Sequence, residues 1–126
     1  MTKSEPNMDE ILPLTPIVFH ILLALTDGEK HGYGIMQTVA ADTDGKVRIP
    51  IGSLYGAIQR MQALGLIEET DERPAPELDD ERRRHYYRLT GVGQQALKAE
   101  VRRLANAVTM AKRKRIFAEF QLRYLG

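Results

Sequence analysis

The chain has 126 residues, a formal net charge of +1, 43% hydrophobic and 28% charged residues, and no cysteine. This size and composition predict one globular domain, and the lack of cysteine excludes disulfides, thiolate catalysis and cysteine-bound metals. The three histidines, His20, His31 and His85, do not have the spacing of helical metal ligands. We therefore expect that the protein binds no metal or cofactor and is not an enzyme. No apolar run approaches the roughly 20 residues of a membrane span, and the acidic N-terminus is unlike a secretory signal. We therefore expect a cytoplasmic protein.

The charge is unevenly distributed along the chain. Residues 1–67 carry a net charge of −2, residues 68–81 carry −7, and residues 82–126 carry +10. A positive C-terminal third indicates an anionic partner such as nucleic acid. The acidic segment and the near-neutral total favour instead a module that binds other proteins.

The first part of the chain predicts two helices after a polar arm. We expect residues 1–12 to be a poorly ordered arm. Thr15 and Pro16 are typical of an N-cap and a first helical position, so a helix should begin there. It should end at Asp27-Gly28, and a second helix is predicted from Tyr33 to Ala41.

A short strand and a third helix follow. Residues 46–49 alternate polar and apolar, which predicts a strand. The third helix is predicted from Ile51 to Leu64 and should end at Gly65. Its buried face should contain three side chains that recur at helical spacing, namely Leu54, Ile58 and Met61.

The last part of the chain predicts a β-hairpin and a long helix. Residues 66–70 and 84–89 are expected to be strands, and the acidic, proline-containing segment 71–81 is expected to be the loop between them. Thr90 should cap a helix that continues from Gly91 to Leu125.

This order of elements is typical of a mainly α fold with a small β-hairpin, the winged helix-turn-helix. We expect residues 13–90 to form a DNA-binding domain and residues 91–126 to form a C-terminal dimerisation helix. A second subunit is the simplest partner for such a long helix.

The third helix is the candidate for reading DNA. A recognition helix needs an apolar stripe that docks it and small or polar residues that enter the major groove. The face opposite the predicted apolar stripe provides such residues, namely Gly52, Ser53, Gly56, Gln59 and Arg60. The alternative is an ordinary amphipathic helix, and this helix alone does not decide between the two.

Further candidates lie outside the third helix. Arg82, Arg83 and Arg84 at the base of the hairpin could contact phosphates, or they could pair with nearby acidic residues such as Glu68 and Glu69. We expect His31 to cap the second helix and His20 to be packed. Tyr87 is expected to border the core, whereas for Tyr55 we favour DNA contact.

The final helix contains an apolar seam with coiled-coil spacing. Leucines and alanines recur every seven residues, and valine or leucine fills the position between them, with Arg115 as the polar exception. The alternative is packing onto its own domain, which the first turns of the helix could also do. The proposed dimerisation residues are Leu97, Val101, Leu104, Val108, Ala111, Ala118, Leu122 and Leu125.

Four motifs in the same order and spacing resemble the PadR family of bacterial transcriptional regulators. They are His31-Gly32-Tyr33-Gly34-Ile35, Gly52-Ser53-Leu54-Tyr55, Gly65-Leu66-Ile67, and Arg84-His85-Tyr86-Tyr87-Arg88-Leu89-Thr90 with Gly93. The resemblance covers roughly residues 14–104 and is similar to the subfamily with a short C-terminal region. Gly56 stands where the family commonly has proline, and the chain has no tryptophan for an aromatic ligand site of the kind found in some members.

The resemblance implies a homodimeric repressor that binds a palindromic operator in double-stranded DNA, often until a small molecule releases it. It also implies DNA contacts from Ser53 and Tyr55 and a phosphate contact from Tyr33. We expect any such effector to bind between the long helices and the winged domains, where Phe117, Phe120 and Tyr124 are the available aromatic groups near the seam. The alternative is that these three side chains belong to the core. The alternative function is a winged-helix protein-interaction module that does not bind DNA.

Overall fold

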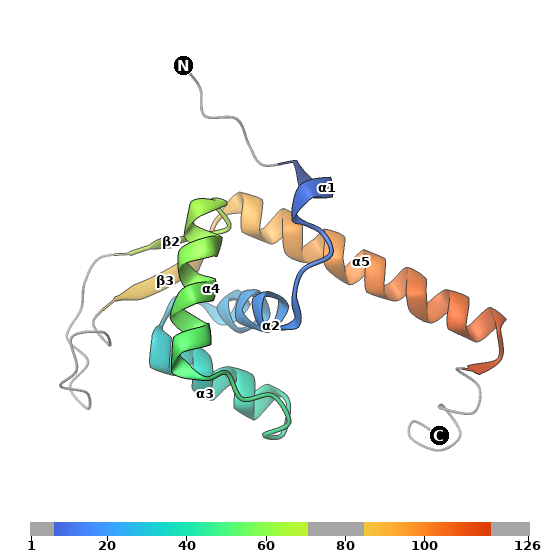
Figure 1. Ribbon diagram of the computed structural model, residues 1–126, viewed down its shortest axis with the longest axis horizontal. Coiled ribbons are helices and arrows are strands. Elements are labelled where there is room, and N and C mark those ends of the chain that lie inside the picture. Colours follow the sequence, from blue (N-terminus) through green and yellow to red (C-terminus); the bar gives the residue numbers. More distant parts are fainter. Residues whose placement is uncertain (1–6, 71–84, 117–126) are drawn as a thin grey trace.

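The computed structural model describes residues 7–70 and 85–116. Three helices form a compact unit, a small sheet closes one end of it, and a long helix leads away (Figure 1). The elements in chain order are α1 (Met8–Ile11), α2 (Pro16–Ala24), the 3₁₀ turn η1 (Leu25–Asp27), β1 (Lys30–His31), α3 (Gly32–Asp42), α4 (Ile51–Ala63), β2 (Ile67–Glu69), β3 (Tyr86–Leu89) and α5 (Gly91–Arg113). This is the expected winged-helix architecture with a long C-terminal helix.

The helix starts predicted from capping residues are confirmed. The side chain of Thr15 accepts the Val18 N–H at 3.2 Å, and Pro16 occupies the first position of α2. His31 caps α3 by accepting the Gly34 N–H on Nδ1 at 2.9 Å. Each acceptor satisfies one of the free N–H groups that a helix leaves at its N-terminus.

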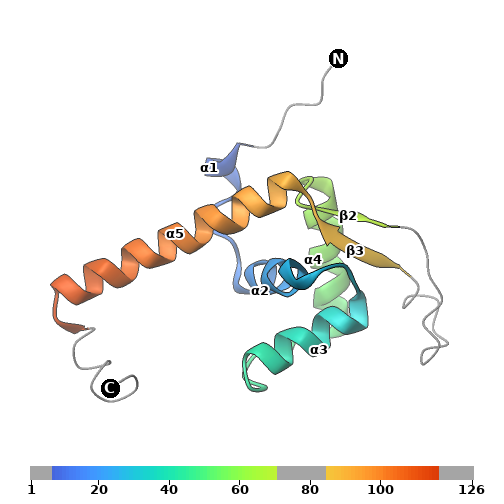
Figure 2. The same ribbon diagram turned by 180° about the vertical axis from the view of Figure 1, so that it is seen from behind.

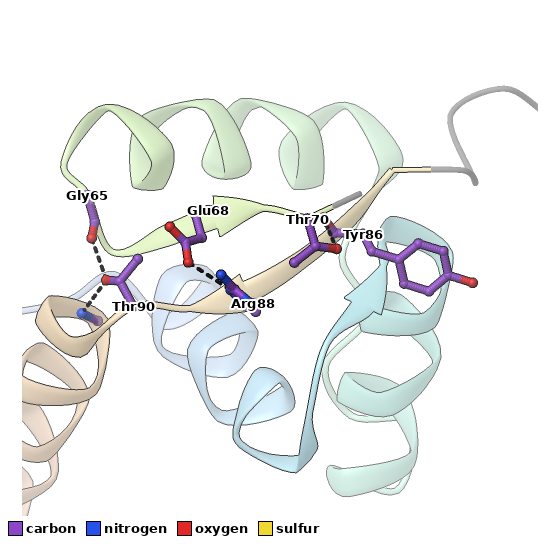
Figure 3. A network of polar contacts seen from close by, with 7 residues as sticks. Gly65, Glu68, Thr70, Tyr86, Arg88 and Thr90 are labelled. Carbon is purple, nitrogen blue, oxygen red and sulfur yellow. Dashed lines mark hydrogen bonds and ion pairs between the residues drawn. The ribbon is translucent and has the colours of Figure 1, made fainter. Parts of the chain in front are cut away.

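The junction between the hairpin and α5 depends on Thr90. Its hydroxyl oxygen accepts the Gly93 N–H at 3.0 Å and donates to the Gly65 carbonyl at 2.5 Å (Figure 3). Gly65 has a φ of 75°, a left-handed conformation that glycine adopts readily after a helix. Thr90 therefore ties the end of α4 to the start of α5.

The sheet is antiparallel with the order β1-β3-β2. The predicted hairpin is confirmed, with Ile67 opposite Leu89 and Glu68 opposite Arg88. The strand predicted at residues 46–49 is wrong, since the third strand is Lys30–His31, paired with β3. In the 46–49 segment the Val47 N–H donates to the Thr43 hydroxyl instead of to a neighbouring strand.

Two predicted boundaries also need correction. The predicted polar arm includes α1, because Asn7 caps this short helix and Met8, Ile11 and Leu12 pack against the core; residues 1–6 lie outside the described part. The last helix was expected to reach Leu125, but α5 ends at Arg113. Four consecutive cations, Lys112 to Arg115, lie where α5 ends; like charges at this spacing repel each other, and Arg115 has a φ of 66°.

The core lies where α2, α3, α4, the sheet and the first turns of α5 meet. The predicted apolar faces of α2 and α4 are confirmed, with Ile21 and Leu22 from α2 and Leu54, Ile58 and Met61 from α4 all at most 1% exposed. Ala96 and Leu97 bring α5 into the same cluster. Beyond them α5 extends past the other described elements, as the view from behind also shows (Figure 2).

Gly93 is expected to tolerate no side chain. A Cβ at this position would overlap the Leu66 carbonyl oxygen, which accepts the Thr90 N–H at 3.1 Å. Overpacking of this kind costs roughly 1–3 kcal/mol, so Gly93→Ala should lower the free energy of unfolding by about that amount in urea denaturation. Gly91→Ala in the same helix is the control, because a Cβ there meets nothing within 4 Å. Equal stability of the two variants would contradict this account.

Candidate nucleic-acid interface

Helix α4 separates its residues into a docking face and an open face, as predicted. Leu54, Ala57, Ile58 and Met61 are buried. The proposed DNA-reading residues Gly52, Ser53, Gln59 and Arg60 are exposed, and Gly56 is half-buried. The structure thus brings all five predicted α4 residues onto one solvent-facing side of one helix.

The N-terminus of α4 is accessible. Pro50 occupies the N-cap position, and no side chain caps the helix among the described residues. A Cβ added to Gly52 would meet nothing within 4 Å, so open space surrounds the backbone of the first turn. Free N–H groups at a helix N-terminus favour an anion such as a phosphate.

The two tyrosines proposed near DNA have different surroundings. Tyr33 on α3 is 39% exposed and stacks on His31 with ring centroids 6.5 Å apart. Tyr55 is half-buried, and its hydroxyl lies so close to Gly32 that a Cβ there would stand 2.5 Å away. Tyr33 therefore presents its side chain to solvent, whereas Tyr55 also joins α4 to the start of α3.

Acidic residues of the wing pair across the hairpin. Arg88 Nε donates to Glu68 Oε1 at 2.7 Å (Figure 3), and His85 Nδ1 pairs with Glu69 Oε1. The sequence offers Glu68, Glu69, Asp71 and Glu72 as alternative partners of Arg82, Arg83 and Arg84; these arginines, Asp71 and Glu72 lie outside the described residues. The strand register, with Glu68 opposite Arg88, is the signal that could have identified the actual partner.

Tyr87 belongs to the core, as expected. It is 6% exposed, and burial, with smaller contributions from Glu69 and Tyr55, raises the pKa of its hydroxyl to about 12. The phenol is therefore neutral at physiological pH. His20, expected to be packed, is half-buried and lies edge-on to Phe19.

The proposed dimerisation seam divides into two parts. Leu97 is buried within its own chain, which agrees with the alternative considered for the first turns. Val101, Leu104 and Val108 are 46%, 37% and 43% exposed, and Ala111 is half-buried. Ala118, Leu122 and Leu125 lie outside the described residues.

One apolar groove lies between the winged unit and α5. It has a volume of about 750 Å³, and its apolar lining comes from α2, η1, β3 and α5. Residues of both apolar and charged type line it, including Leu23, Leu25, Leu89, Leu97, Val101, Arg88 and Lys98. Phe117, Phe120 and Tyr124, proposed for an effector site, lie outside the described residues.

The fold is that of a winged-helix protein with an accessible recognition helix. The model of the PadR-like family of transcriptional regulators matches residues 21–99. The chain therefore belongs to this family, whose members are transcriptional regulators and not enzymes. No curated protein matches the sequence.

Solved structures of regulators are similar to this chain. A transcriptional regulator from Clostridium thermocellum is 26% identical with a TM-score of 0.63, over 77% of this chain and 87% of that one. Bacillus subtilis PadR in complex with operator DNA is 21% identical with a TM-score of 0.59, over 71% of this chain and 48% of that one. Bordetella bronchiseptica BpsR, whose DNA binding is regulated by 6-hydroxynicotinic acid, is 23% identical with a TM-score of 0.55, over 89% of this chain and 79% of that one.

The described part of the chain contains no candidate for a membrane span or a metal centre. No helix within it is long and apolar enough to cross a bilayer. In residues 7–70 and 85–116, no three His, Asp or Glu side chains gather as a metal site requires.

Proposed function

We propose that this member of the family is a homodimeric, sequence-specific repressor that binds a palindromic operator. The observation that supports this most is the open face of α4, where Gly52, Ser53, Gln59 and Arg60 are exposed at a helix docked by four buried side chains. Small residues at the leading end permit close approach to base edges, and longer polar side chains follow. Such a regulator would act in the cytoplasm, where its DNA lies.

The other proposed contacts surround α4. Ser53 and Tyr55 would contact DNA from the helix itself, and Tyr33 would place its hydroxyl on a phosphate from α3. Arg82, Arg83 and Arg84 of the wing would contribute phosphate contacts, which position a protein on DNA without reading sequence. Within the described hairpin, Glu68 and Glu69 pair with Arg88 and His85.

The second copy would be held by the exposed part of the seam. Val101, Leu104 and Val108 project from a helix that extends past its own domain, and a second α5 would cover them. A dimer would also present two α4 helices to two half-sites about one turn of DNA apart.

A small-molecule effector would bind in the groove between α5 and the winged unit. The groove is mostly apolar and also contains Glu29, Arg88 and Lys98 in its lining, which suits an apolar ligand with a few polar groups. Leu97 and Val101 belong to both the groove and the seam. A ligand bound in the groove would therefore contact residues of the dimer interface. A thermal-shift screen that finds no compound able to release DNA would contradict this part.

The proposed function is tested by selection of duplexes from a random-sequence DNA library. Enrichment of an inverted repeat supports a palindromic operator. Failure to enrich any sequence would favour the alternative, a winged-helix module that binds other proteins. A gel shift with DNA upstream of the protein's own gene provides a second measurement.

Arg60→Ala should weaken binding to the selected duplex. If Arg60 reads a base, the loss is about 1–3 kcal/mol and is concentrated at one position of the half-site. If it contacts phosphate, the loss is uniform across sequences and the salt dependence of binding becomes shallower. Arg102→Ala on α5 removes the same charge far from α4 and is the control. Unchanged affinity of Arg60→Ala would remove Arg60 from the interface.

A further inference from the structure

One exposed aliphatic side chain stands at the leading end of the recognition helix. Ile51 is the first residue of α4 and is 48% exposed. The other large aliphatic residues exposed in the described ranges lie elsewhere: Leu64 follows the far end of α4, and the rest are on or just beyond α5. Ile51 is therefore the one such side chain at the DNA-facing tip of the winged unit as described.

The chain presents Ile51 rigidly. Two residues earlier Ile49 is anchored in the core at 3% exposure. Pro50 follows with φ of −61°, which its ring fixes, and Ile51 already belongs to the helix. A β-branched side chain has few rotamers, so the position of its methyl groups varies little.

The neighbours of Ile51 leave it prominent. Gly52 and Ser53 are small and exposed, and a Cβ added to Gly52 would meet no atom within 4 Å outside its chain neighbours and its own helix backbone. The Ile51 side chain is larger than those of its neighbours, and about half of its surface is exposed to solvent. Such a side chain is suited to an apolar group on the molecule that α4 approaches.

We infer that Ile51 contacts the 5-methyl group of a thymine in each operator half-site. This inference rests on the proposed function, because it requires α4 to enter the major groove. The thymine methyl is the one apolar group that protrudes from the base edges into that groove, where the other groups used for readout are hydrogen-bond donors and acceptors. Ile51 would thus specify a thymine through its methyl group, whereas Arg60 and Gln59 would contact polar groups of the DNA.

The test replaces thymine by deoxyuridine, which keeps the base pair and removes only the methyl group. A duplex enriched from the random library is resynthesised with deoxyuridine at one thymine pair after another, symmetrically in both half-sites. Burial of one methyl-sized group corresponds to roughly a fourfold change in affinity. We expect the intact protein to lose about fourfold per half-site, or roughly 15-fold for both, at one symmetric position.

Ile51→Ala should bind thymine and deoxyuridine equally at that position while it keeps the sensitivity of the parent elsewhere. Leu64→Ala removes a similarly exposed aliphatic side chain at the other end of α4 and should keep the full thymine preference. Thermal unfolding of both variants checks that the fold is intact. Ile51→Val, which retains a β-branched side chain, should keep most of the preference.

The outcomes separate this inference from the function on which it rests. If no duplex is enriched, the proposed function fails. If a duplex is enriched but the parent binds every deoxyuridine version with the same affinity as the thymine version, the inference about Ile51 is wrong. The proposed function as a DNA-binding regulator is then unaffected. The same conclusion follows if Ile51→Ala keeps the methyl dependence of the parent, because another residue then contacts the methyl group.

Discussion

Replacing Val101, Leu104 and Val108 together by glutamine should convert the protein into folded monomers and weaken binding to its selected duplex by about 100-fold or more. The three side chains are between 37% and 46% exposed in a single chain, so their loss leaves the core of the winged unit intact. Glutamine is a good helix former, so α5 itself should persist.

The loss of affinity follows from linkage of two weak contacts. In a dimer, the second recognition helix meets its half-site at a high effective concentration once the first is bound. Separate monomers lose this gain although every protein–DNA contact is still available. Binding of the variant to a single half-site should therefore change little, whereas binding to the full inverted repeat should fall.

Sedimentation of the variant measures whether it is monomeric, and titration with the duplex measures its loss of affinity for DNA. Met110→Gln is the matched control, since Met110 is 57% exposed on the same helix but lies outside the two heptad positions that form the seam. It should remain dimeric and bind as the parent does. A triple variant that sediments as a tight dimer would place the interface elsewhere.

The parts of this fold that sequence predicted best are those that local chemistry determines. Thr15, His31 and Thr90 are capping residues, and a cap depends on only a few neighbouring residues. The buried face of α4 follows from the spacing of Leu54, Ile58 and Met61. The proposed DNA-reading residues share one face for the same reason, since they occupy the positions that this spacing leaves outside.

The errors arise where pairing depends on distant parts of the chain. Residues 46–49 alternate as a strand does, but Thr43 captures the Val47 N–H and no neighbouring strand is present. Lys30 and His31 are too few to show a period of two, and they form a strand only because β3 lies beside them. Tertiary contact also orders α1, whose apolar residues pack against the core.

An ion pair within α5 joins a buried carboxylate, Glu100, to a half-exposed arginine, Arg103, and the sequence pattern did not predict it. The side chain of Glu100 is 3% exposed and lies among core residues. Arg103 donates to both carboxylate oxygens at 2.8 Å. The hydrogen bond from Arg103 holds the pKa of Glu100 below its ordinary value against the opposing effect of burial, with help from the Leu14 backbone and the charge of Arg103.

Glu100→Gln should lower the free energy of unfolding by roughly 1–3 kcal/mol at neutral pH, because it replaces charge-assisted hydrogen bonds at a buried site with weaker ones. A carboxyl whose pKa is lower in the folded state stabilises the fold above its unfolded pKa, and this contribution disappears as the pH falls through the folded pKa. The difference in stability between parent and Glu100→Gln should therefore shrink on acidification from about pH 5 to about pH 3.

Removing the other partner should give a deficit that also narrows on acidification, but the narrowing should begin at a higher pH. In Arg103→Ala the buried carboxylate loses its principal donor and the nearby positive charge, so its pKa rises relative to the parent. Protonation of Glu100 then relieves an unpaired buried charge, and the deficit of this variant relative to the parent should narrow as the pH falls toward 5. Urea denaturation of the parent, both single variants and the double variant at several pH values measures the coupling, with Arg102→Ala as the control on the same helix. Additive effects of the two substitutions at neutral pH would show that the contact between Glu100 and Arg103 does not stabilise the fold.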